Sequence, residues 1–400
     1  MLKREQVVYQ EKLQEQMEKF DLDALILSHP ETVFYATGTC NHIMYATFRV
    51  GMGLAVVPRK GKVTLVCSNY DYQAASISAP TDVDFRIYPI WTYIEDLDDG
   101  NEMKPQPDPN QTWRIACEAI REKCPEIKRI GVERTYLPYD RMVFLQETFG
   151  KDTIVDGAQA IVEARAIKTP WEIDCMRKAA DATHRAMFEV AQNTHEGLSE
   201  ADMVNLWNKA FANQGPDYYD RHSVHAFADM YSPVVIPRKD VILKEGDIVK
   251  LDGTLFYQGY ISDISRSYVV GDKLDPRKED IYATLLEAHD MEFKMAGPGA
   301  RIDEIFDVCL DIVKKKYPNY KRGHFGHSIG CNKFPEEAPF MSNAEKRIMK
   351  PGMVFCFEVP YYSSQNGSYN LEDEVVITET GIERLCAVPR TLKWKTLYND

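Results

Sequence analysis

Two segments of the sequence each place a pair of acidic residues on opposite sides of a turn. The first, GDIVKLDGTLFYQGYISDISRSYVVGD, carries Asp252 and Asp263 in β-forming stretches that flank Gln258-Gly259. If this segment forms an antiparallel hairpin, we expect the two aspartates to be directly opposed, with Cβ atoms about 5 Å apart. Adjacent carboxylates repel each other, so their chemistry is cation binding or the sharing of a proton.

The second segment, MVFCFEVPYYSSQNGSYNLEDEVVITETG, repeats this arrangement with glutamates. Its turn is predicted at 364–368, which contains the strong hairpin signal Asn366-Gly367. A turn centred on Gln365 makes Glu358 and Glu372 opposed residues. Single acidic residues are most often solvated surface charges, but two hairpins that each pair carboxylates across a turn favour a bound cation.

One histidine is placed to complete such a site. His327 lies in GHSIGCNKFPEE, where glycines flank it in a strand-like setting and no second histidine follows. A histidine of this kind would be assigned to the core if it stood alone. Together with four carboxylates it is predicted to be a nitrogen ligand, and this donor set suits a pair of divalent transition metal ions.

The composition restricts the class of protein. The 400 residues are enough for two domains, and 44% of them are hydrophobic. The net charge of −13 argues against nucleic-acid and anionic-membrane partners, which need basic surfaces. No apolar run approaches the roughly 20 residues of a membrane span. The nine cysteines contain no CxxC pair, which is typical of free thiols in a reducing compartment. We therefore expect a cytoplasmic protein.

The elements that would position these residues fall into two parts. Residues 1–162 alternate strand-like and helix-like segments and predict an α/β domain with a largely parallel sheet. In ARAIKTPWE, Thr169, Pro170 and Glu172 form the start signal of a long helix. Residues 163–400 are predicted to be an α+β domain in which helices surround the two hairpins.

The order Asp, Asp, His, Glu, Glu resembles the pita-bread metalloenzymes of metallopeptidase family M24, which include Xaa-Pro aminopeptidases, prolidases and creatinase. The segments that carry the resemblance are KLDGTLFYQGYISDISRSY, GHSIG, KPGMVFCFE and LEDEVVITETG. The resemblance implies an α+β pita-bread catalytic domain. It also implies a preceding creatinase-type α/β domain, which would serve in dimerisation and pocket closure.

The resemblance further implies a dinuclear metal site. Its ligand positions in this sequence are Asp252, Asp263, His327, Glu358 and Glu372. Asp263 and Glu372 would bridge two divalent ions, for which Mn²⁺, Fe²⁺ or Co²⁺ is expected and Zn²⁺ also fits. Glu358 would in addition act as the general base toward the metal-bound water that attacks the substrate.

Two substrate-facing histidines of the family's peptidases are replaced in this sequence. Their positions correspond to Val234 and Phe334, so the pocket is expected to be more apolar and a poorer proton donor. His324 and His225 are the candidates for the missing proton transfer, and Tyr231 is a candidate for contact with the substrate.

Three functions are compatible with this pattern. The first is hydrolysis of a small amide or peptide C–N bond, as in Xaa-Pro peptidases. The second is a non-peptidase activity on the same fold, similar to dimethylsulfoniopropionate lyase or creatinase, with a small betaine or guanidino compound as substrate; the replaced histidines favour it. The third is a non-catalytic binding protein, against which five retained ligands argue. We expect a small-molecule or dipeptide substrate, and the resemblance implies a homodimer.

Overall fold

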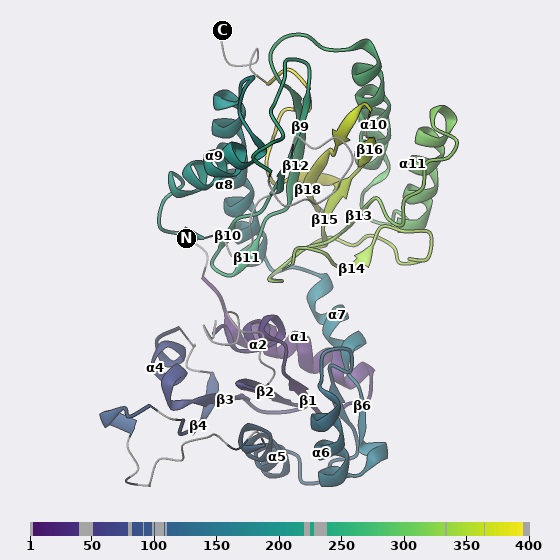
Figure 1. Cartoon of the computed structure of the whole chain (residues 1–400). Helices are drawn as coiled ribbons and strands as arrows, with labels where there is room; N and C mark the ends of the chain where they lie inside the picture. Colours follow the sequence, from purple (N-terminus) through teal and green to yellow (C-terminus); the bar gives the residue numbers. More distant parts are fainter. Residues whose placement is uncertain are drawn as a thin grey trace. The chain divides into compact units, whose positions relative to one another are not determined.

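The chain forms two compact units, Lys3–Arg165 and Ala166–Asp400, in the computed structural model (Figure 1). The structure describes residues 3–39, 51–78, 82–90, 92–97, 100, 108, 110–219, 225–227, 238–332, 334–363 and 365–394, with the backbone alone for 219 and 225–227. In the sequence, the boundary between the units falls within helix α7 (Ala158–Ala166), a few residues beyond the boundary predicted after residue 162.

A six-stranded sheet in the order β4-β3-β2-β1-β5-β6 is the centre of the first unit. Its strands are β1 (Ala24–Leu27), β2 (Gly53–Pro58), β3 (Val63–Ser68), β4 (Val83–Tyr88), β5 (Ile130–Val132) and β6 (Ile154–Asp156). Three neighbouring pairs are parallel, but β2 runs antiparallel to both β1 and β3. The sheet is therefore mixed rather than largely parallel, because the short connection 59–62 can join only antiparallel neighbours.

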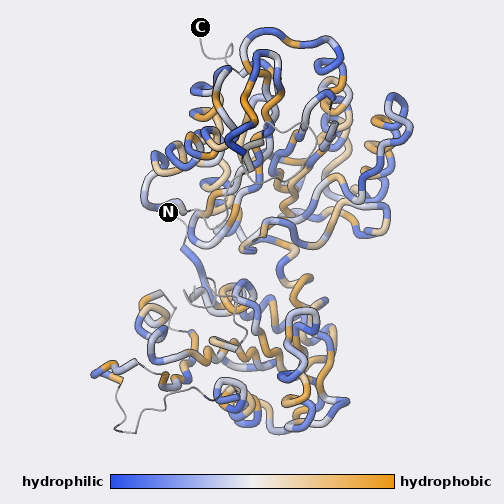
Figure 2. The backbone as a smooth tube through the Cα atoms, viewed as in Figure 1, coloured by the Kyte–Doolittle hydropathy of each residue, from blue (hydrophilic) through white to orange (hydrophobic). Residues whose placement is uncertain are grey.

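Helices pack around this sheet. They are α1 (Gln6–Lys19), α2 (Pro30–Thr37), α4 (Asn69–Ser78), α5 (Gln111–Lys123), α6 (Tyr139–Phe149) and α7. The first helix buries Tyr9, Leu13 and Met17, which are spaced four residues apart and therefore share one face. Figure 2 shows the same pattern throughout the unit, with hydrophobic residues along the central strands and hydrophilic residues on the outer turns of the helices.

The second unit is built on an antiparallel sheet in the order β14-β13-β15-β18-β12-β9-β8, with β19 paired to β18. Its strands are β8 (His225–Phe227), β9 (Ile248–Gly253), β12 (Ile264–Val269), β13 (Gly326–Ser328), β14 (Glu337–Phe340), β15 (Val354–Glu358), β18 (Glu372–Ile377) and β19 (Ile382–Arg384). Two smaller sheets contain β7 (Tyr218–Tyr219) with β10 (Phe256–Tyr257) and β11 (Tyr260–Ile261), and β16 (Tyr361–Ser363) with β17 (Gly367–Tyr369).

Local signals explain where the helices of this unit begin. The helices are α8 (Pro170–Asn193), α9 (Glu200–Ala212), α10 (Pro276–Met295) and α11 (Ile302–Lys316). The predicted capping box of α8 is confirmed, because the Thr169 side chain accepts from the Glu172 amide while Glu172 accepts from the Thr169 amide. Ser199 and Asp202 form a second capping box at α9.

The two faces of the large sheet differ in character. Phe355, Phe357 and Val375 are buried in the hydrophobic core that includes residues of α10 and α11. Because successive side chains of a strand point to opposite faces, Glu358 and Glu372 project from the other face. The helices thus cover one face with a largely apolar layer, and Glu358 and Glu372 lie on the opposite face.

The register of the two hairpins confirms one prediction and corrects the other. Glu358 and Glu372 are directly opposed on β15 and β18, as predicted. Asp252, however, is opposed to Ser265 rather than to Asp263. Gln258 and Gly259 have φ of 52° and 85°, which is typical of a two-residue type I′ turn, and they pair Tyr257 with Tyr260. The turn lies where it was predicted, but Asp252 precedes it by six residues and Asp263 follows it by only four, so Ser265 is opposed to Asp252.

No helix in the described part of the chain is long and apolar enough to cross a membrane.

Candidate metal centre

The predicted ligands come from five neighbouring positions of the large sheet. Asp252 lies near the end of β9, His327 in the middle of β13, Glu358 at the end of β15 and Glu372 at the start of β18. Asp263 immediately precedes β12. Since β13, β15, β18, β12 and β9 are consecutive in the sheet, residues more than a hundred positions apart in sequence are brought to one region.

His327 is held so that one ring nitrogen faces two carboxylates. Its Nε2 lies 3.6 Å from Asp263 Oδ2 and 3.6 Å from Glu372 Oε1. Its Nδ1 lies 3.0 Å from the carbonyl oxygen of Ser328, which can only accept, so the proton of the neutral ring belongs on Nδ1. This leaves the Nε2 lone pair directed at the carboxylates, as in histidines that bind metals.

Burial and like charge act together on the two inner carboxylates. The pKa of Asp263 is raised well above its usual value, first by burial and then by Glu372 and Asp252. The pKa of Glu372 is also raised well above its usual value, first by burial and then by Glu358 and Asp252. Without a cation these groups favour the protonated form, and a divalent ion would take the place of the protons.

Two cationic side chains accompany the outer carboxylates. Lys250 Nζ donates to Asp252 Oδ2 at 3.0 Å, and Arg322 Nη2 donates to Glu358 Oε1 at 2.5 Å. Burial acts to lower the pKa of Lys250, but Asp252, Tyr362 and Glu372 outweigh it, so the pKa is raised and the ammonium stays charged. These cations bind the outer carboxylates and leave the oxygens of the inner pair for protons or for divalent ions, which the donor set fits.

A second group of donors adjoins Glu358. Ligand atoms of His324, Glu336 and Glu358 all lie within 4.8 Å of one another. His324 Nδ1 is 3.3 Å from Glu358 Oε1, although the two are not aligned as a hydrogen bond. Burial is the main cause that lowers the pKa of His324, so its ring is neutral near pH 7. A neutral imidazole at this distance can exchange a proton with the carboxylate through a small rotation or one water molecule.

The segment after His327 places a polar group at the site. Phe334 is 62% exposed in this chain, whereas Glu336, two residues further on, belongs to the group around Glu358. The segment therefore contributes a carboxylate beside Glu358, where an aromatic contact was expected.

The remaining predicted residues are placed in part or not at all. The backbone of His225 in β8 is directly opposed to Asp252 in β9, which brings this position next to a predicted ligand. Tyr231 and Val234 lie outside the described residues.

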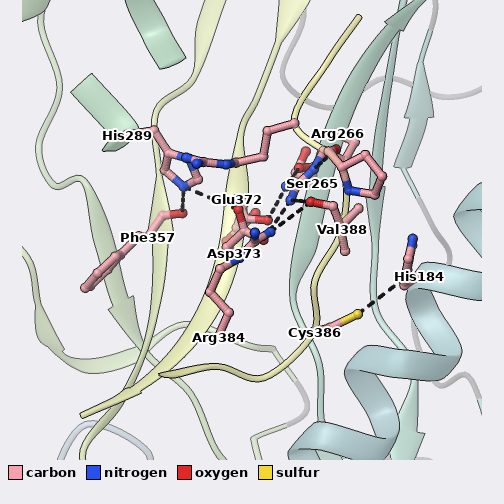
Figure 3. Close-up of polar contacts among 12 residues, drawn as sticks. His184, Ser265, Arg266, His289, Phe357, Glu372, Asp373, Arg384, Cys386 and Val388 are labelled. Atoms are coloured by element: carbon pink, nitrogen blue, oxygen red, sulfur yellow. Dashed lines mark hydrogen bonds and ion pairs between the residues drawn. The ribbon is translucent and has the colours of Figure 1, made fainter. Parts of the chain in front are cut away.

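The opposite face of the sheet holds a buried arginine that fixes the position of a ligand strand (Figure 3). β12 and β18 share a single directly opposed pair, Ser265 and Glu372. Beside it, Arg266 Nη1 donates to the backbone oxygens of Ser265 at 2.8 Å and Glu372 at 2.7 Å, and its Nη2 donates to Asp373 Oδ1 at 2.7 Å. Arg266 also donates to the backbone oxygens of Val388 and Pro389.

Because β12 and β18 share a single opposed pair, the side chain of Arg266 provides a further connection between these two strands. Its planar group offers five donors in a fixed arrangement, so a single side chain can join several backbone oxygens. The sequence pattern did not single out Arg266, because all the oxygens that it binds, except that of the adjacent Ser265, come from segments more than a hundred residues away.

Each of the two units matches a known protein family or domain. Residues 174–379 match metallopeptidase family M24, and residues 10–167 match the creatinase/prolidase N-terminal domain. The uncharacterized peptidase YqhT of Bacillus subtilis is 30% identical over 267 residues, which cover 66% of this chain and 75% of that protein. The Xaa-Pro dipeptidase of Pyrococcus furiosus is 27% identical over 274 residues, which cover 68% of this chain and 78% of that one.

A solved structure gives the same picture. The prolidase from Pyrococcus horikoshii OT3 superposes with a TM-score of 0.77 at 22% sequence identity, covering 96% of this chain and 99% of that one. Together these likenesses confirm the predicted fold, an α+β pita-bread domain preceded by a creatinase-type α/β domain.

Proposed function

The chain belongs to metallopeptidase family M24, and from this premise we propose that it is a metal-dependent dipeptidase that hydrolyses Xaa-Pro dipeptides. The observation that carries the proposal is the convergence of Asp263, His327 and Glu372, with ring nitrogen and carboxylate oxygens 3.6 Å apart in a buried position. We include the preference for Xaa-Pro dipeptides in the proposal because the relative from Pyrococcus furiosus is named an Xaa-Pro dipeptidase.

Divalent ions held by these residues would polarise the scissile carbonyl and lower the pKa of the attacking water. Asp263 and Glu372, at the centre of the group, would hold both ions, while Asp252 and His327 would hold one each. We propose Mn²⁺, Fe²⁺ or Co²⁺ as the ions, since the donors are oxygen and imidazole nitrogen.

The chain's own residues supply the proton transfers. Glu358 would accept a proton from the attacking water, and its position opposed to Glu372 of the inner pair supports this role. His324 would carry the proton onward to the leaving amine, which its Nδ1 at 3.3 Å from Glu358 Oε1 supports. Arg322 holds the same carboxylate oxygen and thereby fixes its direction.

The assembly and the location are also part of the proposal. The resemblance to creatinase and prolidase supports a homodimer in which the N-terminal domain helps to close the pocket. The nine cysteines without a CxxC pair support a location in the cytoplasm, which is a reducing compartment.

The decisive experiment is hydrolysis by the full-length chain after metal removal and reloading. We expect hydrolysis of Xaa-Pro dipeptides to disappear with a chelator and to return with Mn²⁺ or Co²⁺. Glu358→Gln should lower kcat by about 10²–10⁴-fold, the usual contribution of a general base. The matched control is Glu379→Gln, an exposed residue of the same unit, which should leave kcat unchanged.

The same screen addresses the non-peptidase alternative. Creatine and small betaines are tested beside Xaa-Pro, Pro-Xaa and Xaa-Ala dipeptides. If the metal-loaded chain turns over a betaine or creatine and none of the dipeptides, the peptidase proposal is overturned. Both relatives reported above are named as peptidases, and neither supports this outcome.

A further inference from the structure

A buried cysteine lies beside the proposed metal ligands. Cys356 is in the middle of β15, directly opposed to His327 on β13 and to Glu374 on β18. Directly opposed residues of antiparallel strands share a face of the sheet, with Cβ atoms about 5 Å apart. Cys356 therefore projects from the same face as Glu358, two residues further along its strand.

The distances are those of donors around one ion. The sulfur of Cys356 and one ligand atom each of Asp263, His327 and Glu372 all lie within 4.8 Å of one another, and all four residues are buried. A tetrahedral ion with bonds of about 2.0–2.3 Å separates its donors by about 3.3–3.8 Å. The 3.6 Å separations from His327 Nε2 already match this, and the sulfur lies within 4.8 Å of each of the other donors.

From this geometry we propose that Cys356 supplies a sulfur donor to the ion held by His327, Asp263 and Glu372. The inference rests on the metal centre of the proposed function and specifies one of its two ions. When the metal–sulfur bond forms, the thiol proton is released to solvent and the thiolate electron pair becomes the bonding pair. A set of one nitrogen, one sulfur and two oxygens favours Zn²⁺, Co²⁺ or Fe²⁺ over Mn²⁺, because thiolate is a soft ligand.

A buried carboxylate lies on the other side of Cys356. Glu374 is 2% exposed, and its Oε1 accepts from the Asp263 amide at 2.5 Å. Its Oε2 is buried and has no hydrogen-bond partner within the described part of the chain. An unsatisfied carboxylate oxygen is costly in an apolar interior, and this one belongs to the residue opposed to Cys356, next to the proposed ligands.

The other cysteines of this unit do not share these surroundings. Cys309 is also fully buried, but its sulfur lies 3.4 Å from the backbone oxygen of Ala288 in the helical layer. Within the described residues, Cys356 is the cysteine that belongs to a group of metal-type donors. Cys309 therefore provides a matched control, with equal burial and no metal donors beside it.

The test is spectroscopic and does not depend on turnover. The full chain is stripped of metal and loaded with Co²⁺, and its spectrum is recorded for wild type, Cys356→Ser and Cys309→Ser. A sulfur-to-cobalt charge-transfer band in the near ultraviolet is expected in the wild type and in Cys309→Ser. The band should be lost in Cys356→Ser while the visible cobalt bands remain.

X-ray absorption on the zinc-loaded wild type provides a second measurement that needs no variant to fold. A zinc–sulfur distance of about 2.3 Å is expected. Visible cobalt bands without charge transfer, and zinc with nitrogen and oxygen neighbours alone, would overturn the sulfur ligand and leave the metal centre standing. A charge-transfer band that persists in Cys356→Ser would overturn it as well. Failure of the wild type to bind either metal would remove the proposed function together with this inference.

Discussion

Glu358 and Glu372 are directly opposed across β15 and β18, and both are buried. Opposed like charges destabilise a sheet, and burial increases the cost because water no longer screens them. A fold that keeps this pair in its central strands needs protons or a cation between the carboxylates. The raised pKa of Glu372 is the expression of this conflict in the metal-free chain.

Metal should therefore stabilise the fold, and one substitution should remove the effect. An ion present at about 100 times its Kd raises the free energy of unfolding by about 2.7 kcal/mol. In Glu372→Gln we expect this gain to be lost, while the metal-free variant is at least as stable as metal-free wild type because the neutral amide needs no bound proton to be buried. Thermal unfolding of wild type and variant, with and without Mn²⁺ or Co²⁺, measures both the stability of the metal-free protein and the gain on metal binding. An equal gain in the variant and the wild type would contradict the assignment of Glu372 as a ligand.

Arg266 should contribute more to stability than the second arginine at the same carboxylate. Both Arg266 and Arg384 donate to Asp373 Oδ1, but the side chain of Arg266 is fully buried whereas that of Arg384 is 27% exposed. Arg266→Met should destabilise the protein by about 3–5 kcal/mol, the usual cost of breaking a buried ion pair. Arg384→Met should cost clearly less, because solvent reaches that side chain and Arg266 still pairs with Asp373.

The same pair of variants tests whether Arg266 positions the metal centre. Only Arg266 also donates to the backbone oxygen of Glu372, so metal affinity should fall in Arg266→Met and not in Arg384→Met. Chemical denaturation and metal titration by calorimetry provide the two readouts. Equal losses in both variants would show that Arg266 has no specific role at the ligand strand.

Glu292 should make stability depend on pH. It is fully buried on α10, and neither carboxylate oxygen has a hydrogen-bond partner in the described part of the chain. Its pKa is raised well above the usual value, first by burial and then by Glu358 and Asp373. The folded chain thus binds this proton more tightly than the unfolded chain, so the contribution is fully present below about pH 4.3 and is lost as pH rises toward the raised value.

Glu292→Gln removes that loss. Relative to wild type, the variant should gain stability steadily when urea unfolding is measured between about pH 5 and about pH 8. The exposed Glu287 on the same helix is the control, and Glu287→Gln should follow wild type over the whole range. A constant offset between Glu292→Gln and wild type would mean that the carboxyl does not titrate in this window.

Lys168 and Glu337 should behave as one unit. Lys168 Nζ donates to Ser328 Oγ at 2.6 Å and to Glu337 Oε1 at 3.0 Å, and the two charged side chains are 1% and 9% exposed. Lys168→Met leaves a buried carboxylate without this cation, so we expect a loss of about 3–5 kcal/mol. The double variant Lys168→Met/Glu337→Gln should be less destabilised than the sum of the single ones, which a double-mutant cycle of unfolding free energies measures. Simple additivity would argue against the pairing.

Local sequence signals determined the elements and one of the two registers. The capping box at Thr169 and Glu172 placed the start of α8, because the signal and the structure it produces lie within one helical turn. Asn366-Gly367 similarly placed the turn that makes Glu358 and Glu372 opposed residues. The first hairpin turns at Gln258-Gly259 as predicted, but it was misaligned by two residues, because Asp252 lies six residues before this turn and Asp263 only four after it.

By itself the sequence determined which residue types were available for metal chemistry and on which kinds of element they lie, because these follow from composition and short-range pattern. Only the tertiary structure decided that His327 faces Asp263 and Glu372, that Cys356 lies between His327 and Glu374, and that Arg266 joins two distant strands. These relations depend on which strands become neighbours in the sheet. Strand order is set by the packing of the whole unit, which no local pattern encodes.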